Sequence, residues 1–283
     1  MNYQQIFPTP RCAFNLTSSH STPIMAQNSL IYCMKTIALI PAYNASKTIR
    51  GVVERIPRDI VQEVLIVNDG STDRTLEVLR DLHNVQIITH DKNKGYGAAQ
   101  KTLYKTALTH PHDFTVILHA DGGHFPEEIS LLLEPMKKGI ADIVIGSRIR
   151  GILKTTSPLL GSRFLGAMFQ STMPRYKFLA NVALTNFQNL LLGTHYYSFH
   201  CGFRACSRKI LEAIDWDFFS DWYLFDMEFL VYAHRAQKKI LEVPVGTFYD
   251  QNAGSSVPSI RYGLKTLGFS LKQSLNRFTS KPL

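Results

Sequence analysis

The sequence has no uninterrupted apolar run approaching the ~18 residues of a membrane-spanning helix, so an integral membrane protein of that kind is not expected. Its four cysteines (Cys12, Cys33, Cys201 and Cys206) form no CxxC pair and no zinc-ligand spacing. A disulfide scaffold and a zinc module are therefore disfavoured, and a reducing compartment is expected. Hydrophobic residues still make up 45% of the 283, enough to bury the core of one large domain.

Two common phosphate-binding motifs are also missing. No G-x-G-x-x-G follows the first apolar strand, which disfavours the usual dinucleotide-binding fold, and no G-x-x-x-x-G-K-[ST] occurs, which disfavours a P-loop NTPase. Residues 1–33 lack the basic start and apolar run of a secretory signal. They are rich in Ser, Thr, Asn, Gln and Pro, and we expect a disordered extension with Met34 as a candidate for the true start.

Acidic residues are absent from two stretches near the C-terminal end. Residues 143–211 contain nine basic residues and no acid, and residues 251–283 contain five basic residues and no acid. The net charge of +9 therefore arises in these stretches. Such a surface suits a phosphorylated substrate, an anionic membrane or nucleic acid. The interleaved aromatics and motifs of nucleic-acid binders are missing, so no nucleic-acid partner is expected.

From Lys35 onward, strand-like apolar runs alternate with segments of helical spacing. Strands are expected at 35–41, 63–68, 85–89, 114–119 and 142–146, and helices at 45–56, 73–83, 95–109 and 126–138. Asn44 or Ser46 is a candidate N-cap of the first helix, and Ser71 of the second. This order predicts a Rossmann-like α/β fold whose mostly parallel sheet is flanked by helices.

The pattern changes after Ser147. Residues 158–193 are expected to be mostly helical, 201–206 and 240–245 to form strands, and 226–236 to form a helix. Residues 260–278 predict an amphipathic helix with an apolar stripe and basic residues off that stripe. Such a helix suits a membrane interface, and it can equally pack its stripe onto the core.

Polar or glycine-rich clusters follow the first four strands, at 41–44, 68–71, 91–97 and 119–124. Ligands of such sheets bind at the carboxyl ends of the strands, so these clusters should gather along one edge. A carboxylate there suits ribose hydroxyls or a base edge, and glycines let the backbone approach a ligand. A helix start at Gly95 or Gly97 would also suit phosphate.

Eight short motifs occur in an order that indicates a family. They are IPAYN (40–44), VNDGSTDRT (67–75), NKGYGAA (93–99), HADGGHFPEEI (119–129), DIVIGSR (142–148), CGFRA (201–205), FDMEFLVYA (225–233) and EVPV (242–245). Over about residues 35–267, the chain resembles the family 2 glycosyltransferases, most of all their polyprenyl-phosphate (dolichyl-phosphate type) sugar transferases. The resemblance implies a GT-A fold over 34–259 followed by the basic helix at 260–283. It also implies a nucleotide-sugar donor and transfer with inversion.

The resemblance carries over residue by residue. The residues expected to bind the nucleotide sugar are Pro41, Ala42, Tyr43, Asn44, Asp69, Lys94, Gly95, His119, Ala120 and Asp121. Those expected to act in catalysis are Asp121, Asp226, Glu228, Arg148 and Arg204, with Gly202 and Phe203 in the loop on the acceptor side. Asp226 and Glu228 are two apart, so they should not share one face of a helix.

The D-x-D motif of the family is altered here. Asp121 matches its last residue, but His119 stands at the first position, and Gly123 stands where the lipid-phosphate transferases often have Gln. A departing nucleoside diphosphate gains negative charge, which a divalent cation stabilises. We expect Mg²⁺ or Mn²⁺ on Asp121, with His119 as a candidate second ligand. A catalytically silent nucleotide-sugar-binding protein is the alternative that these departures leave open.

The acceptor follows from the same chemistry. A polyprenyl phosphate is already an anion, so it needs no base, and Arg148 and Arg204 would position it. The alternative is a hydroxyl of a cell-envelope glycan or glycolipid, which would need a carboxylate base such as Glu228. The donor base, UDP or GDP, stays open. A lipid acceptor implies a cytoplasmic protein with peripheral contact to the inner face of the cytoplasmic membrane.

Overall fold

The computed structural model describes residues 34–147, 175–246 and 259–276. The predicted extension at 1–33 and the predicted catalytic residue Arg148 lie outside these ranges. Seven strands form one sheet: β1 (Thr36–Ala42), β2 (Glu63–Asn68), β3 (Gln86–Thr89), β4 (Phe114–Ile117), β5 (Ile143–Ser147), β6 (Arg204–Ser207) and β7 (Ile240–Pro244). Each strand begins and ends within three residues of the bounds expected from the sequence.

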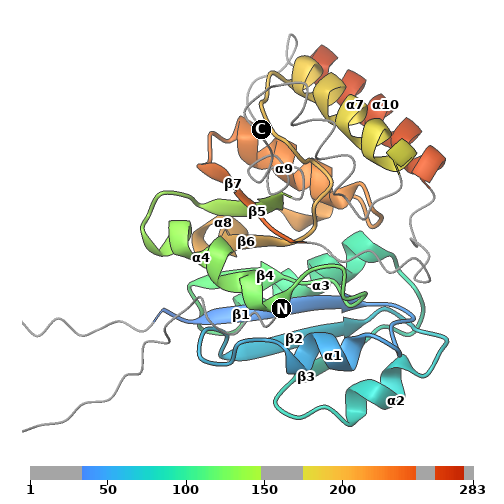
Figure 1. Cartoon of the computed structure of the whole chain (residues 1–283), viewed down its shortest axis with the longest axis vertical. Helices are drawn as coiled ribbons and strands as arrows, with labels where there is room; N and C mark the ends of the chain where they lie inside the picture. The colour runs from blue at the N-terminus through green and yellow to red at the C-terminus, as the bar shows by residue number, and fades with distance from the viewer. Residues whose placement is uncertain (1–33, 148–174, 247–258, 277–283) are drawn as a thin grey trace, which may run out of the picture. The chain divides into compact units, whose positions relative to one another are not determined.

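The strands lie in the order β3-β2-β1-β4-β6-β5-β7, which can be followed from bottom to top in Figure 1. Every neighbouring pair is parallel except the two pairs that contain β6, which runs antiparallel to β4 and to β5. The predicted Rossmann-like, mostly parallel sheet is therefore confirmed, with one strand reversed.

Helices connect the strands. The α-helices are α1 (Ile49–Glu54), α2 (Thr75–Arg80), α3 (Tyr96–Leu108), α4 (Ile129–Lys137), α7 (Arg175–Leu192), α8 (Arg208–Glu212), α9 (Phe225–Arg235) and α10 (Ser259–Asn276), and two 3₁₀ turns are η1 (Pro126–Glu128) and η2 (Trp216–Phe218). Helices α1 and α4 cover one face of the sheet, while α3, α8 and α9 cover the other (Figure 1).

Burial on both faces explains why the central strands are apolar almost throughout. Residues 37–40 of β1 and 64–67 of β2 are at most 2% exposed. On the face of α3, the rings of Tyr104, Trp216 and Phe229 stack on one another with centroids 4.8–6.4 Å apart. These aromatic contacts fix α9 against α3, which matters because α9 carries both Asp226 and Glu228.

The predicted helix caps are wrong. Helix α1 begins only after Thr48, and α2 only after Arg74, with no side-chain cap at either. The Asn44 side chain instead accepts the N–H of Thr72 at 2.8 Å, while Ser71 Oγ accepts the N–H of Asn44 at 3.0 Å. The local preference for capping loses because the loops after β1 and β2 are side by side and bond to each other.

The C-terminal helix is present where the apolar stripe predicts it. Helix α10 packs against α7, and the two helices lie side by side at the upper right of Figure 1. In the three described ranges, no helix is both long and apolar enough to cross a bilayer.

Candidate active site

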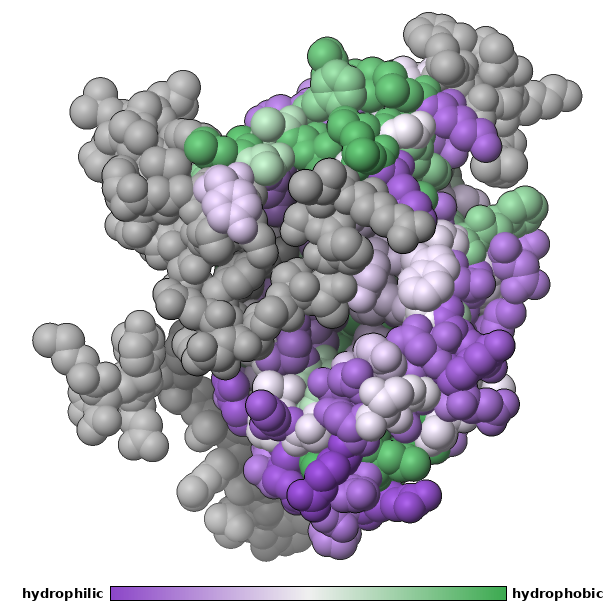
Figure 2. Space-filling view, turned by 90° about the vertical axis from the view of Figure 1, so that its right-hand side faces the viewer, coloured by the Kyte–Doolittle hydropathy of each residue, from purple (hydrophilic) through white to green (hydrophobic). Residues whose placement is uncertain are grey.

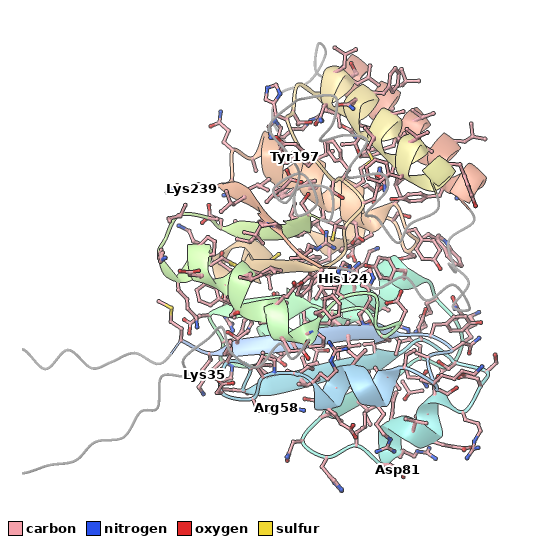
Figure 3. The ribbon with its side chains drawn as sticks, viewed as in Figure 1. Lys35, Arg58, Asp81, His124, Tyr197 and Lys239 are labelled. Atoms are coloured by element: carbon pink, nitrogen blue, oxygen red, sulfur yellow. The ribbon has the colours of Figure 1, made fainter. Side chains whose placement is uncertain are left out.

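Strand direction brings the predicted segments to one edge of the sheet. In register, Ile117 at the end of β4 pairs with Leu39 of β1 and with Arg204, the first residue of β6. Because β6 is reversed, its beginning lies beside the carboxyl ends of its neighbours. The 201–204 segment therefore meets the segments that follow β1, β2 and β4. Figure 3 marks His124, which follows β4, well away from Lys35, which precedes β1.

Asp69, directly after β2, is an internal acceptor. Its side chain is 2% exposed and accepts the backbone N–H of Lys94 at 3.0 Å and that of Gly95 at 2.9 Å. His90 Nδ1 lies 2.6 Å from Asp69 Oδ1. Three groups that follow β3 thus bond to one carboxylate. Asp69 therefore holds the 90–95 loop beside β2, which places Lys94 and Gly95 at the predicted nucleotide-binding edge.

The start of α3 is packed against the segment at 220–222. Gly95 has φ +105°, and a Cβ there would lie 2.4 Å from the carbonyl oxygen of Asp221. A Cβ on Gly97 would lie 2.2 Å from the carbonyl oxygen of Ser220. The N–H of Ala98 donates to the Asp221 carbonyl at 3.0 Å. Protein groups therefore occupy the helix start that the sequence suggested for phosphate.

His119, Tyr96 and Asp226 form a chain of hydrogen bonds. The Tyr96 hydroxyl lies 2.9 Å from His119 Nε2 and donates to Asp226 Oδ2 at 3.0 Å. The Tyr96 and His119 rings are perpendicular, with centroids 5.7 Å apart. This chain joins the altered first position of D-x-D to the first turn of α9.

Asp226 is also paired with a buried cation. Its Oδ1 accepts Gln100 Nε2 at 2.7 Å and Arg204 Nη2, and Arg204 donates to Gln100 Oε1 at 2.7 Å. Arg204 is 3% exposed, and its guanidinium lies over the ring of Phe229, 4.6 Å from the centroid. Arg204 and Asp226 therefore neutralise each other inside the protein, behind the sheet edge.

Burial shapes the titration of this cluster. Burial, together with the charge of Asp226, raises the pKa of the Tyr96 hydroxyl well above its usual value. Burial alone would lower the pKa of Arg204, but the combined attraction of Asp226 and of the neighbouring Tyr104, Cys206 and Tyr96 outweighs it, and the pKa lies above its usual value. At neutral pH, Tyr96 is thus a neutral donor and Arg204 a cation.

Gly202 makes room for this arrangement. A Cβ at Gly202 would lie 2.1 Å from His119 Nε2 and 2.6 Å from the Tyr96 hydroxyl oxygen. No side chain fits there unless the histidine or the tyrosine moves. The glycine that the sequence placed on the acceptor side therefore belongs to the wall against which His119 lies.

Asp121 differs from the buried carboxylates because it is exposed to solvent. Its Oδ1 accepts the N–H of Gly123 at 2.9 Å, and Oδ2 accepts no hydrogen bond from the described residues. The preceding carbonyl, that of Ala120, accepts the Thr48 hydroxyl at 2.7 Å and ties this turn to the start of α1. Asp121 is thus held in place with one oxygen open to a ligand.

Glu228 has different partners from Asp226, as two residues apart on a helix require. Its Oε2 accepts the N–H of Ser220 at 2.6 Å. Burial raises its pKa, although the bond from Ser220 and the charge of Lys101 oppose the shift. Glu228 is half-buried and positions the 220–222 segment that packs on α3.

Three residues predicted to bind the nucleotide sugar lie at or just after the end of β1, the strand next to β4. Ala42 is buried at the end of β1, whereas Tyr43 is 45% exposed and Asn44 has φ 50°. A flat ring next to a polar loop suits a nucleobase. The edge therefore combines an exposed aromatic ring, an exposed carboxylate and a partly exposed imidazole.

Three residues of the cluster were not singled out from the sequence. Tyr96 and Gln100 are four apart on α3, so they share one face and both reach Asp226. That spacing, within and just after NKGYGAA, could have indicated from the sequence that the two side chains act on one partner. His90 had none, because nothing local indicates that it meets Asp69.

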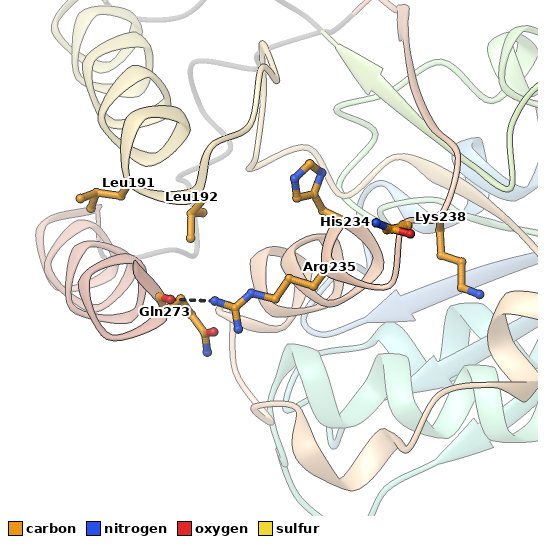
Figure 4. Close-up of a pocket in the computed structure, with 7 residues that line it drawn as sticks. Leu191, Leu192, His234, Arg235, Lys238 and Gln273 are labelled. Carbon is orange, nitrogen blue, oxygen red and sulfur yellow. Dashed lines mark hydrogen bonds between the residues drawn. The ribbon is translucent and has the colours of Figure 1, made fainter. Parts of the chain in front are cut away.

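A cavity of about 560 Å³ lies elsewhere, at the far end of α9 from Asp226. Figure 4 shows its lining, which comes from the ends of α7 and α9 and from α10: Leu191, Leu192, His234, Arg235, Gln237, Lys238 and Gln273. Arg235 donates to the carbonyl of Gln273 at 2.7 Å. This cationic cavity is not part of the sheet-edge cluster.

Comparison with known proteins identifies the family. The sequence model described as "Glycosyl transferase family 2" matches residues 37–215, more than half of the chain. The chain therefore belongs to glycosyltransferase family 2, and it is a glycosyltransferase.

Two curated relatives span nearly the same length. UDP-N-acetylglucosamine–dolichyl-phosphate N-acetylglucosaminyltransferase of Methanococcus voltae is 28% identical, over 80% of this chain and 91% of the relative. Undecaprenyl-phosphate mannosyltransferase of Micrococcus luteus is 31% identical, over 79% of this chain and 87% of the relative. By their names, both transfer a sugar to a polyprenyl phosphate.

The fold is shared with a solved enzyme of the GT-A type. Glucosyl-3-phosphoglycerate synthase from Mycobacterium tuberculosis, solved with Mn²⁺, UDP-glucose and phosphoglyceric acid, aligns with a TM-score of 0.58 and 17% identity. The alignment covers 85% of this chain and 79% of that one. The predicted GT-A fold is confirmed.

Proposed function

We propose that this protein transfers a hexose-type sugar from a nucleoside diphosphate to a polyprenyl phosphate with inversion. The observation that carries the proposal is the sheet edge, where exposed Asp121 lies two residues after His119, which Tyr96 links to the buried Asp226–Arg204 pair. The relatives support the choice of acceptor, because their names specify dolichyl and undecaprenyl phosphates.

The donor would bind along the carboxyl edge. Tyr43 offers an exposed ring to the base, and Lys94 and Gly95 are held nearby by Asp69. Pro41, Ala42, Asn44 and Ala120 contribute backbone and small side chains to the same edge. Because both carboxylate oxygens of Asp69 are buried and hydrogen-bonded to protein groups, its role is to position this loop.

A divalent cation fits the open oxygen of Asp121. Bound there, Mg²⁺ or Mn²⁺ would neutralise the charge that develops on the departing diphosphate. In the described residues, no group of three or more His, Cys, Asp or Glu could hold a metal alone, so donor oxygens and water must complete the site.

The buried pair acts through geometry. Arg204 is too buried to meet a lipid phosphate, so its role, and that of Asp226, is to fix Tyr96 and the first turn of α9. The phosphate acceptor attacks as an anion and needs no base. We expect other basic residues to contact that acceptor. Arg148 is the first of the nine basic residues in the acid-free stretch at 143–211.

The surface of α7 and α10 supports contact with a membrane. Leu190 is 79% exposed, Leu264 66% and Leu271 48%, while Thr266 and Ser270 of α10 are fully buried. Helix α10 therefore does not pack its whole apolar stripe onto the core. Figure 2 shows apolar side chains gathered over the upper part of the molecule, where these helices lie. Apolar residues next to Lys265 and Lys272 suit the inner, anionic face of the cytoplasmic membrane.

The test is sugar transfer by the full-length protein. Donors would be UDP-N-acetylglucosamine and GDP-mannose, each with polyprenyl phosphate or with a glycolipid that offers only hydroxyls, and each with Mg²⁺ or Mn²⁺. We expect product on the lipid phosphate with inverted anomeric configuration. Product on the hydroxyl acceptor alone would favour a glycan transferase that uses Glu228 as base. Donor binding without any product would favour a nucleotide-sugar-binding protein.

A further inference from the structure

The hydrogen-bond chain at the sheet edge has a direction. The Asp226 carboxylate contacts the Arg204 guanidinium, and a carboxylate accepts hydrogen bonds without donating any. Arg204 and Gln100 donate to Oδ1, and Oδ2 accepts its hydrogen bond from the Tyr96 hydroxyl, 3.0 Å away. The alternative would place two oxygens at that distance with no proton between them.

The direction passes on to His119. A tyrosine hydroxyl can donate one hydrogen bond, and Tyr96 donates it to Asp226. Toward His119 Nε2, 2.9 Å away, the Tyr96 oxygen can therefore only accept. Nε2 must carry a hydrogen, and in a neutral imidazole the other nitrogen, Nδ1, is then a bare acceptor.

The remaining nitrogen is available to a ligand. Nδ1 of His119 has no hydrogen-bond partner among the described residues, and the side chain is partly exposed. Two positions further along the chain, Asp121 has the same property at Oδ2. The turn after β4 thus has one ring nitrogen and one carboxylate oxygen that no described residue hydrogen-bonds, where the usual motif has two carboxylates.

We propose that Tyr96 and Asp226 lock His119 as the Nε2–H tautomer, so that Nδ1 and Asp121 together bind the donor's divalent cation and favour transition metals over Mg²⁺. This rests on the proposed function only for the identity of the donor. Imidazole nitrogen suits transition metals, whereas Mg²⁺ requires oxygen ligands. A histidine in place of the first carboxylate also removes one negative charge from the site, which weakens the binding of Mg²⁺ further.

The tautomer is tested on the full-length protein without metal. ¹⁵N-histidine NMR should show a protonated Nε2 and a bare Nδ1 for His119, with its signals assigned by their loss in His119→Asn. Tyr96→Phe cannot accept a hydrogen bond from Nε2–H and should therefore give a mixture of the two tautomers. A proton on Nδ1 in the wild-type protein would overturn the proposal, whether or not the protein transfers sugar.

The ligand role is tested by calorimetry of UDP and GDP with Co²⁺, Mn²⁺ or Mg²⁺. We expect the better nucleotide to bind at least about tenfold more tightly with Co²⁺ or Mn²⁺ than with Mg²⁺. His119→Asp should raise binding with Mg²⁺, since it restores the second carboxylate. His119→Asn places an oxygen near the position of Nδ1 and His119→Gln near that of Nε2, so of these two variants only His119→Asn should keep metal-dependent binding.

The outcomes separate the two proposals. Equal binding with Mg²⁺ and Co²⁺, or retention by His119→Gln and loss in His119→Asn, would overturn the metal role of Nδ1 while sugar transfer stands. Failure of the wild-type protein to bind either nucleotide under any condition would overturn the proposed function, and the NMR result would still decide the tautomer.

Discussion

Asp121 is the residue on which the proposed chemistry depends most directly, because it is the exposed carboxylate at the end of β4. We expect Asp121→Asn to lower kcat/KM by about 100-fold or more, since the amide cannot replace a charge that stabilises the transition state. The measurement is sugar transfer at saturating Mn²⁺. The matched control is Asp59→Asn, which changes another exposed carboxylate, one with no hydrogen bond among the described residues, and it should behave as wild type. Full activity in Asp121→Asn would contradict the site.

The Arg204–Asp226 pair is structural in our reading. Removing one partner leaves a buried charge alone, which typically costs about 3–5 kcal/mol of unfolding free energy. We expect losses of that size in Arg204→Met and in Asp226→Leu, measured by urea denaturation. The double variant should lose clearly less than the sum, because no lone charge remains. Additive losses would show that the two side chains do not stabilise each other.

Glu228 makes the unfolding free energy depend on pH. Its pKa is raised in the folded protein, so between its unfolded and folded pKa values the folded state binds more protons and the unfolding free energy falls as pH rises. At neutral pH the full penalty is present. Glu228→Gln keeps an acceptor for Ser220 and should be slightly more stable than wild type at pH 7, with the gain lost near pH 4. Thermal unfolding across this range checks the sign, and destabilisation at pH 7 would refute it.

At the scale of elements, α10 is the informative helix. It buries Thr266 and Ser270, whose hydroxyls donate to helix carbonyls at 2.7–3.1 Å, and it exposes Leu264 and Leu271. Back-bonding satisfies the buried hydroxyls within the helix, so the core tolerates them. The two leucines remain free to enter a lipid interface.

Removing those leucines should weaken membrane binding. Each exposed Leu contributes on the order of 1 kcal/mol on partial burial, so Leu264→Ser with Leu271→Ser should weaken vesicle affinity roughly 10- to 100-fold. Co-sedimentation with anionic vesicles measures this. Leu131→Ser on α4, which is 41% exposed and lies on a different surface, is the control. Equal binding by both variants would place the membrane contact elsewhere.

At the scale of the whole molecule, charge complements that apolar surface. The net charge of +9 comes from two acid-free stretches, one of which contains α7 and the other α10. Attraction to anionic lipids is screened within about 10 Å at 0.1 M salt. We therefore expect binding to anionic vesicles to weaken markedly between 0.05 and 0.5 M NaCl, and binding to neutral vesicles to stay weak throughout. Salt-independent binding would mean that the apolar contact acts alone.

Much of the fold could be predicted because its signals are local. Apolar runs with buried faces marked the strands, and helical spacing marked α3, α4, α9 and α10 within one to three residues at their ends. The family motifs located Asp121 and His119 for the same reason, since each motif is a short segment. Helix caps failed, as with Asn44, because a neighbouring loop offered its side chain better partners than its own helix did.

The sequence by itself determined the order of elements, the family and the candidate residues, because these depend on periodicity and short motifs. Only the tertiary structure decided that β6 is reversed, that Arg204 faces Asp226 across the core, and that Tyr96 links Asp226 to His119. Gln100 and Arg204 are 104 positions apart, and no local pattern records such a contact. Packing chooses these partners, and packing also decides which carboxylates are buried and hydrogen-bonded and which one stays exposed.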